Sequence, residues 1–289
     1  MRIQMNKTAN TKNSFLSLIE IAIVILSGFV ASFAMKAVGI SFFALPHLVF
    51  LLLLVFFRSI VSKWKLSDYG FSGSVGQQIK LGILVWIVAQ TYYSVLHLFA
   101  PLFPEAAKIG ATVFKIATPD ALRDAILSIA IFKAGILETL RYFSYAEGLL
   151  IQAFGAPLGA LMTFAYFGSA HMGIMNLIVL PVSFLFVYYY RTYRLVIPLI
   201  ISHALGDTGG FMQNYFSFHG MYAYNYVIFF LLLAGLFLFR NELREVLSHI
   251  RSMVVQDIIW LRDNKVKAIS LSLVLPLWLQ LLLYVENHI

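Results

Sequence analysis

The sequence contains no cysteine, and this absence removes several kinds of functional site at once. Without cysteine the chain can form no disulfide, no thiolate nucleophile and no thiolate-bound metal centre. Charged residues are also scarce, because they make up 12% of the 289 residues, against about 25% in soluble globular proteins. No internal repeat is apparent, which argues against a transporter built from inverted repeats. These absences exclude an ordinary soluble enzyme.

The sequence is instead rich in apolar residues. Hydrophobic residues make up 61% of the chain, and the mean hydropathy is +0.85. The net charge of +8 could suggest a nucleic-acid partner, but the basic residues flank apolar runs. Positive charge in that position is typical of the cytoplasmic ends of membrane helices. The expected partners are therefore a lipid bilayer and no nucleic acid.

The apolar runs predict the fold class. A helix crosses the roughly 30 Å hydrocarbon core with about 20 apolar residues. Such runs lie at residues 15–35, 41–62, 78–103, 121–148, 156–171, 175–190, 195–213, 223–239 and 268–285. We therefore expect an all-α protein, a polytopic membrane helix bundle of about nine transmembrane helices, with eight helices as the alternative.

Lysine and arginine collect on one side of this arrangement, which predicts a cytoplasmic N-terminus. The expected segments are a cytoplasmic N-terminus at 1–14, N-terminal transmembrane helices at 15–103, an outer loop at 104–120, the core helices at 121–213, a transmembrane helix with its preceding outer loop at 214–239, a cytoplasmic amphipathic helix at 240–267 and a C-terminal transmembrane helix at 268–289. In 240–267 apolar residues recur at helical spacing between Arg244, Arg251 and Arg262, as in a helix that lies on a membrane surface.

Four ionisable residues interrupt the apolar runs: Glu138, His171, His203 and Asp207. A charged side chain at the centre of a membrane helix costs about 2.5–3.5 kcal/mol on insertion scales, so such residues usually serve a function. His203 and Asp207 are four residues apart and share one face of a helix. Each residue also has a structural interpretation: an ion pair of Glu138 with Arg141, an interfacial hydrogen bond for His171, and a local pair of His203 with Asp207.

Together these residues have the parts that acyl hydrolysis needs. A carboxylate can activate a water molecule, an imidazole can orient it, and further donors can stabilise an oxyanion. Histidines and carboxylates are also the usual ligands of Zn²⁺, although the HExxH signature of many zinc proteases is absent. We expect no metal and no other cofactor, with a metal-dependent membrane protease as an alternative.

The order of the short motifs resembles that of the CAAX-protease and bacteriocin-processing family of glutamic intramembrane proteases. That family has EExxxR on one helix, FxxxH on the next and HxxxN or HxxxD further on. Here Glu138 matches the first glutamate, Phe167 and His171 match FxxxH, and His203 and Asp207 match HxxxD. The resemblance covers roughly residues 66–215, including a turn at Phe154-Gly155 and the juxtamembrane segment at 66–71.

The first motif departs from the family pattern. Thr139 stands at the second glutamate and Phe143 at the arginine. Their joint replacement suits an enzyme with reorganised surroundings of the site, and equally a decayed enzyme. Arg141 lies about 60° round an α-helix from Glu138 and can supply the missing positive charge. Glu147, nine residues on, is expected about 180° away and at an interface.

The resemblance implies a membrane-embedded endopeptidase in a prokaryotic cell membrane. Glu138 and His171 would activate water, and His203 with Asp207 would support the oxyanion. Because an ionised carboxylate has no proton to donate, Asp207 would be protonated or would orient His203. The substrate would be a membrane-proximal peptide or a membrane protein. The alternatives are a non-catalytic scaffold or regulator with the same fold, and a transporter.

Overall fold

The computed structural model describes residues 65–99, 116–169, 175–221 and 223–266, with isolated positions at 19, 20, 23, 30, 37, 49, 52, 53, 56 and 57. Within these residues the regular elements are all helices, which confirms the all-α class. The expected spans 15–35 and 41–62 are described only at isolated positions. The expected span 268–285 and the candidate site residue His171 lie outside the described residues.

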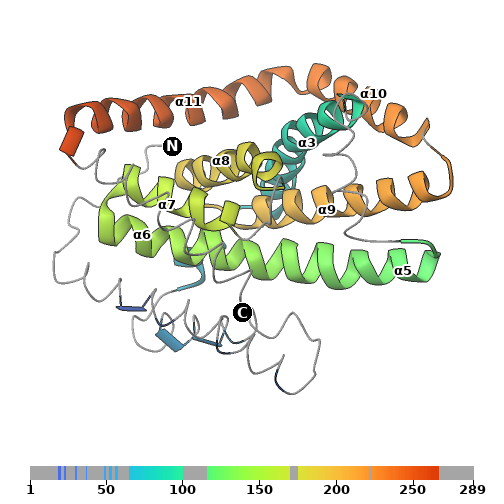
Figure 1. Cartoon of the computed structure of the whole chain (residues 1–289). Helices are drawn as coiled ribbons and strands as arrows, with labels where there is room; N and C mark the ends of the chain where they lie inside the picture. Colours follow the sequence, from blue (N-terminus) through green and yellow to red (C-terminus); the bar gives the residue numbers. More distant parts are fainter. Residues whose placement is uncertain are drawn as a thin grey trace.

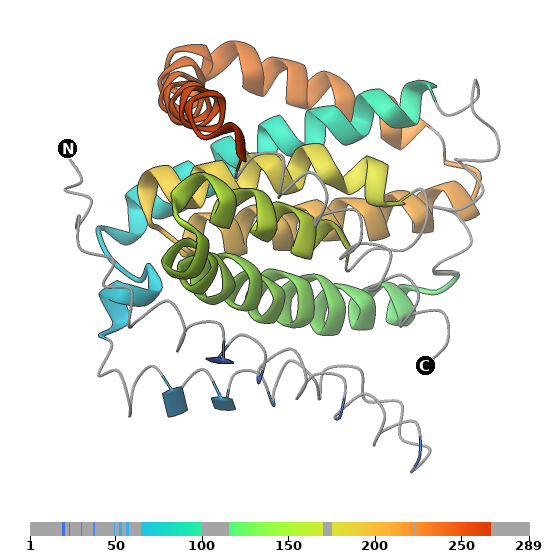
Figure 2. The same cartoon turned by 60° about the vertical axis from the view of Figure 1, so that its left-hand side comes forward.

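The described helices form a layered bundle. They are η2 (Leu66–Tyr69), α3 (Val75–Phe99), α5 (Pro119–Asp124), η4 (Ala125–Glu138), η5 (Leu140–Ala146), α6 (Glu147–Phe154), α7 (Ala156–Ser169), α8 (Met175–Tyr193), α9 (Ile197–Phe218), α10 (Ala223–Leu238) and α11 (Arg240–Asp263). In both views α10 and α11 lie on one side, the long helical run from α5 to α6 lies on the other, and α3, α7, α8 and α9 lie between them (Figures 1 and 2).

Length and hydropathy alone do not single out a membrane span among these helices. Within the described ranges no individual helix is both long and apolar enough to cross a bilayer, and α10 with α11, bent by 81°, passes only as a pair. The number of spans therefore stays a prediction.

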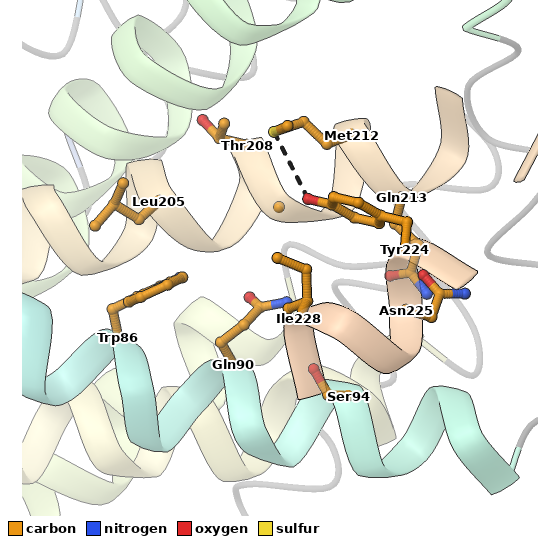
Figure 3. A pocket seen from close by; sticks show the side chains of 11 residues that line it. Trp86, Gln90, Ser94, Leu205, Thr208, Met212, Gln213, Tyr224, Asn225 and Ile228 are labelled. Carbon is orange, nitrogen blue, oxygen red and sulfur yellow. Dashed lines mark hydrogen bonds between the residues drawn. The ribbon is translucent and has the colours of Figure 1, made fainter. Parts of the chain in front are cut away.

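Helix α9 occupies the centre of the bundle, where its most extensive contacts are with η4 and α3. Two glycines allow these close approaches. A Cβ atom on Gly135 of η4 would lie 2.9 Å from the Cβ atom of Ala204, and one on Gly82 of α3 would lie 2.9 Å from the Cβ atom of Ile201. On another side of α9, α3 and α10 meet it around a pocket (Figure 3).

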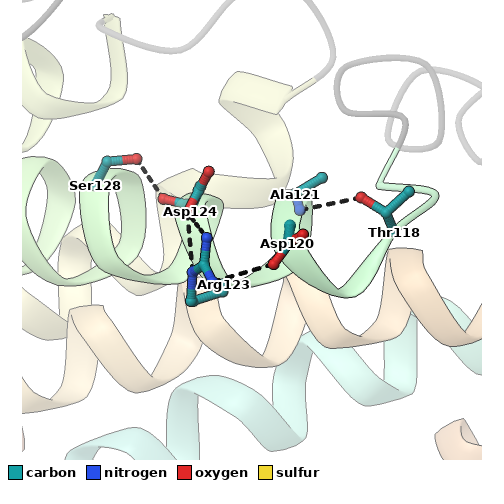
Figure 4. A network of polar contacts seen from close by, with 6 residues as sticks. All are labelled: Thr118, Asp120, Ala121, Arg123, Asp124 and Ser128. Carbon is teal, nitrogen blue, oxygen red and sulfur yellow. Dashed lines mark hydrogen bonds and ion pairs between the residues drawn. The ribbon is translucent and has the colours of Figure 1, made fainter.

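The helical run that carries Glu138 begins at Pro119, inside the segment expected to be an outer loop. The Thr118 side chain caps the run by accepting a hydrogen bond from the Ala121 backbone N–H, at 3.2 Å (Figure 4). Arg123 pairs with Asp120 at 3.0 Å on the first turn. Proline after a capping threonine is a common helix start, because the missing proline N–H would have no partner there.

The run is wound more loosely than an α-helix over most of its length. Both η4 and η5 are π-helices. Each π-helical bond spans five residues rather than four, so a turn takes roughly 4.4 residues instead of about 3.6. This winding changes which side chains meet along the run.

Two turns hold the ends of the core helices. Gly155, with φ of 84°, lies between α6 and α7, where the sequence indicated a turn. Gly70, with φ of 90°, accepts a hydrogen bond from the Val196 backbone N–H at 3.1 Å. The Ser144 hydroxyl donates to the Tyr69 carbonyl at 2.7 Å. These bonds fasten the segment at 66–71 to η5 and to the start of α9.

Helix α11 is amphipathic and packs one face against the bundle. Its buried side chains are Leu243, Val246, Ile250 and Asp257, and its neighbours are α7, α8 and α10. Asp257 forms an ion pair with Arg191 of α8 and accepts a hydrogen bond from the Tyr188 hydroxyl at 2.9 Å. Part of the apolar stripe of this segment therefore packs on protein, whereas Leu247, Val255 and Ile258 are exposed.

Candidate functional site

Glu138 ends η4 and is nearly buried, with its carboxylate directed to a lysine. The Lys133 ammonium lies 3.1 Å from Glu138 Oε1. The two residues are five positions apart, which places them on adjacent turns of a π-helix but on different faces of an α-helix. A buried charge is tolerated when it is paired, so Lys133 is the counter-charge that the carboxylate requires.

His203 is buried on α9 and contacts the residue that follows Glu138. Its Nδ1 lies 3.2 Å from the Thr139 hydroxyl, and both side chains are buried. The same hydroxyl is 3.4 Å from the Ala134 carbonyl, five residues earlier. Thr139, at the position of the second glutamate in the family pattern, therefore links η4 to the imidazole of α9.

Aromatic rings enclose the His203 imidazole on two sides. The ring centroids of Phe167 of α7 and Phe186 of α8 each lie 5.7 Å from the centroid of the imidazole, in an edge-to-face arrangement. Phe143 packs against both phenylalanines, with ring centroids 5.0 Å from Phe167 and 5.6 Å from Phe186. Phe143 is fully buried and is part of the hydrophobic core. The rings restrict the imidazole to a narrow range of orientations.

Asp207 is half-buried one turn after His203 on α9. The charges of Glu138 and Lys133 both act on its carboxyl group. The hydroxyl of Tyr93 on α3 is also close enough to respond to the charge of Asp207. Asp207 thus belongs to the same electrostatic cluster as the Glu138–Lys133 pair.

Arg141 does not serve as the near partner of Glu138. Its guanidinium donates two hydrogen bonds to the Tyr166 hydroxyl, at 2.8 and 3.2 Å. It also lies over the Tyr142 and Tyr166 rings, at 5.4 and 5.7 Å from their centroids. The close ion pair of Glu138 is therefore with Lys133, whereas Arg141 joins η5 to α7 and interacts with the charge of Glu138 at longer range.

The expectation for Glu147 is also wrong. Its side chain is fully buried, not interfacial, and neither carboxylate oxygen has a hydrogen-bond partner among the described residues. The charges of Arg191 and Arg194 act on it. The predicted angle of 180° assumed α-helical winding, whereas nine residues make about two full turns when most of the path is π-helical.

The alternative of a metal site can be compared only with the residues that the structure describes. Within the described ranges, no three histidine or acidic side chains are grouped as a metal ion would require. His171 lies outside those ranges, so its distance to Glu138 and His203 is not part of the described structure.

Sequence reasoning missed three residues that shape the site: Lys133, Tyr166 and Phe186. Lys133 carried a usable signal, because a cation within an apolar helix is itself costly and calls for a partner. Its spacing of five residues from Glu138 concealed the pair, since α-helical partners are three or four residues apart. Tyr166 and Phe186 carried no comparable signal in so aromatic a chain.

The arrangement offers a defined set of chemical groups between η4 and α9. Glu138 is a carboxylate with a counter-ion, and Asp207 is a second carboxyl group within its field. His203 is an imidazole whose Nδ1 atom lies next to the Thr139 hydroxyl, and an imidazole can donate or accept a hydrogen bond according to its tautomer. Comparison of the chain with protein-family models, curated proteins and solved structures finds no match in any of the three.

Proposed function

We propose that this chain is a multi-pass membrane protein of about nine transmembrane helices and a glutamic endopeptidase. Its substrates would be membrane-proximal peptides or membrane proteins. The observation that carries the proposal is that His203 of α9 contacts Thr139, the residue next to Glu138, while Asp207 of α9 lies within the electrostatic field of Glu138. The resemblance of the motifs to the CAAX-protease and bacteriocin-processing family supports the same reaction.

In the proposed reaction, Glu138 takes a proton from a water molecule as the water attacks the scissile carbonyl carbon. Lys133 lies beside the carboxylate and balances its charge before the proton arrives. His171, by the resemblance alone, orients the same water. The proton then passes to the leaving amine, so the carboxylate is regenerated and no metal ion is required.

His203 would stabilise the oxyanion of the tetrahedral intermediate. A neutral imidazole donates from Nε2 only when Nδ1 is unprotonated, and this tautomer requires the Thr139 hydroxyl to donate to Nδ1. The hydroxyl lies 3.2 Å from Nδ1 and 3.4 Å from its other acceptor, the Ala134 carbonyl. Thr139 would thus be a positioning residue that selects the active tautomer.

The second candidate is a non-catalytic scaffold or regulator. Its support is the packing of His203 against Phe167 and Phe186, with Phe143 at the arginine position of the family motif. In that interpretation His203 and Thr139 form a hydrogen-bonded pair within the core, and the Glu138–Lys133 pair is structural.

The deciding experiment compares two glutamates on one helical run. Glu138→Gln and Glu147→Gln are each purified as the full chain and incubated with a mixture of membrane proteins, and new peptide termini are counted by mass spectrometry. We expect Glu138→Gln to lower cleavage by about 10²–10⁴-fold, the usual contribution of a general base. Glu147→Gln should stay within about threefold of the unchanged protein, because Glu147 has no role in the proposed reaction.

Retained cleavage in Glu138→Gln would contradict the peptidase. A cellular phenotype that survives the double change of Glu138→Gln and His171→Ala would favour the scaffold. Activity that EDTA removes and Zn²⁺ restores would indicate a metal-dependent protease instead.

A further inference from the structure

Helix α11 carries its exposed positive charges on a single flank. With about 3.6 residues per turn, successive spacings of four, seven and eleven residues place four exposed arginines within an arc of about 40°: Arg240, Arg244, Arg251 and Arg262. The acidic side chains of α11 that are not buried lie about 100° or more round the helix from all four: Glu242, Glu245 and Asp263. This separation differs from the alternating charges of a solvated helix that is laced by ion pairs.

Exposed apolar side chains lie among these arginines. Leu247, Val255 and Ile258 are 43%, 45% and 59% exposed, and all three fall within about 40° of the centre of the basic flank. They are separate from the face that α11 buries against α7 and α8. We call the four arginines and these three apolar residues the arginine edge. Interleaved basic and apolar side chains on one flank are typical of a helix at a lipid interface.

The preceding helix gives α11 a direction that suits the same interface. Helix α10 exposes large apolar side chains along its length, and it meets α11 at a bend of 81°. A helix that crosses a bilayer and a helix that lies in the plane of its surface meet at about this angle. At the bend, Arg240 donates a hydrogen bond to the Phe237 carbonyl at 3.2 Å and lies over the Phe237 ring. Both views show α11 on the outside of the bundle (Figures 1 and 2).

We propose that the arginine edge binds the headgroups of anionic phospholipids and thereby holds α11 on the surface of the bilayer. A guanidinium donates paired, charge-assisted hydrogen bonds to a phosphate, and the net negative charge of an anionic leaflet attracts clustered arginines. The exposed apolar side chains favour a bilayer over an acidic protein, because they can enter the layer between the headgroups. The inference rests on the membrane location within the proposed function and does not depend on the peptidase activity.

The absence of cysteine allows a clean fluorescence test, because one introduced cysteine can carry a bimane label. Ile258→Cys places the label on the arginine edge, and Gln256→Cys places it about 160° round the helix. Each labelled full chain is reconstituted in nanodiscs of phosphatidylcholine, with or without phosphatidylglycerol, whose brominated acyl chains quench the label on contact. We expect phosphatidylglycerol to raise quenching at position 258 at least twofold and to leave position 256 nearly unchanged. High salt should remove the difference, since the screening length is only about 3 Å at 1 M.

Two double variants lower the net charge equally on different flanks of α11. Arg244→Gln with Arg251→Gln removes two positive charges from the arginine edge, whereas Ser252→Glu with Gln256→Glu adds two negative charges outside it. All four positions are exposed, so both variants should fold, and thermal unfolding is recorded for each. We expect the first variant to lower the phosphatidylglycerol-dependent quenching at position 258 at least fivefold. The second variant should keep at least half of it.

Elution of the chain with the nanodiscs tests the membrane location separately from the lipid preference. A chain that elutes apart from the discs would contradict the membrane location and, with it, the inference. A chain that enters the discs but is quenched equally with both lipids would overturn the inference alone. Equal losses in the two double variants would do the same, because they would show that net charge rather than the arginine edge is responsible.

Discussion

Thr139 shows how a single side chain can change the interpretation of a motif. It stands where the family pattern has a second glutamate, and its hydroxyl contacts the Nδ1 atom of His203. A hydroxyl can donate or accept, so it can select either imidazole tautomer. The hydroxyl therefore contacts His203 without placing a charge in the core.

The role of Thr139 can be tested by removing only its hydroxyl. Thr139→Val keeps the shape but leaves Nδ1 without this partner, so we expect kcat/KM for peptide cleavage to fall about tenfold, the equivalent of one hydrogen bond of about 1.4 kcal/mol. The pH profile of kcat should shift at the same time. Thr139→Ser keeps the hydroxyl and should restore most of the activity. Equal losses in both variants would show that only packing matters at this position.

Tyr166 is the second residue whose effect follows from one contact. Its hydroxyl accepts two hydrogen bonds from the Arg141 guanidinium. Tyr166→Phe removes the acceptor of two hydrogen bonds from a half-buried cation, so we expect the free energy of unfolding to fall by about 1–3 kcal/mol. The measurement is denaturant unfolding of the purified protein in detergent. In an Arg141→Met background, Tyr166→Phe should lower the free energy of unfolding much less. An equal loss in both backgrounds would show that the Arg141–Tyr166 contact is not the cause.

At the scale of elements, the π-helical winding of η4 brings together the groups that an α-helix would separate. The Lys133–Glu138 ion pair and the approach of Thr139 to the Ala134 carbonyl both span five residues. The loose winding does not prevent close packing, because Gly135 lets η4 lie against α9. The distance between these two helices therefore controls how Thr139 meets His203.

This close approach predicts a large effect from one methyl group. In Gly135→Ala the new Cβ atom would lie 2.9 Å from Ala204 Cβ and from the Ala130 carbonyl oxygen. We expect a loss of about 1–3 kcal/mol in the free energy of unfolding from overpacking, together with reduced cleavage. Gly206→Ala on α9 is the control, since its new Cβ atom meets nothing within 4 Å. That change should be neutral or stabilising by up to about 1 kcal/mol, and similar losses in both variants would contradict the explanation.

At the scale of the whole molecule, α11 closes one side of the bundle through one buried and one exposed ion pair. Arg191 and Asp257 are 7% and 3% exposed, and Tyr188 adds a hydrogen bond to the same carboxylate. The exposed pair joins Lys80 of α3 to Glu242 at 3.0 Å. Lys80 also lowers the pKa of Glu242 through their hydrogen bond, so this pair favours folding at neutral pH and its contribution is lost on acidification.

The two pairs should differ strongly in their effect on stability. Asp257→Ala leaves the Arg191 charge buried without its carboxylate, so we expect a loss of about 3–5 kcal/mol in the free energy of unfolding. Glu242→Ala removes an exposed pair that solvent screens, and its effect should be close to the limit of measurement. Both can be measured by thermal unfolding, with limited proteolysis of the segment at 240–266 reporting release of α11. Comparable losses would show that burial does not distinguish the two pairs.

The helical class could be predicted from the sequence, because apolar runs of about 20 residues without strand-like alternation are typical of helices. It also singled out Glu138, His203 and Asp207, since an ionisable group in an apolar run is conspicuous wherever it lies. The amphipathic pattern of 240–267 predicted a helix, and α11 begins at the predicted residue, Arg240.

The tertiary structure alone decided which partners these residues have. Partner choice depends on winding and on neighbouring helices, and neither is encoded in a spacing of three or four residues. Hence Lys133 rather than Arg141 pairs with Glu138, Thr139 contacts His203 across two helices, and Glu147 is buried. The buried Trp86 Nε1 and Gln90 Oε1 atoms likewise have no hydrogen-bond partner among the described residues, because pairing is a property of the surroundings of an atom and not of its residue type.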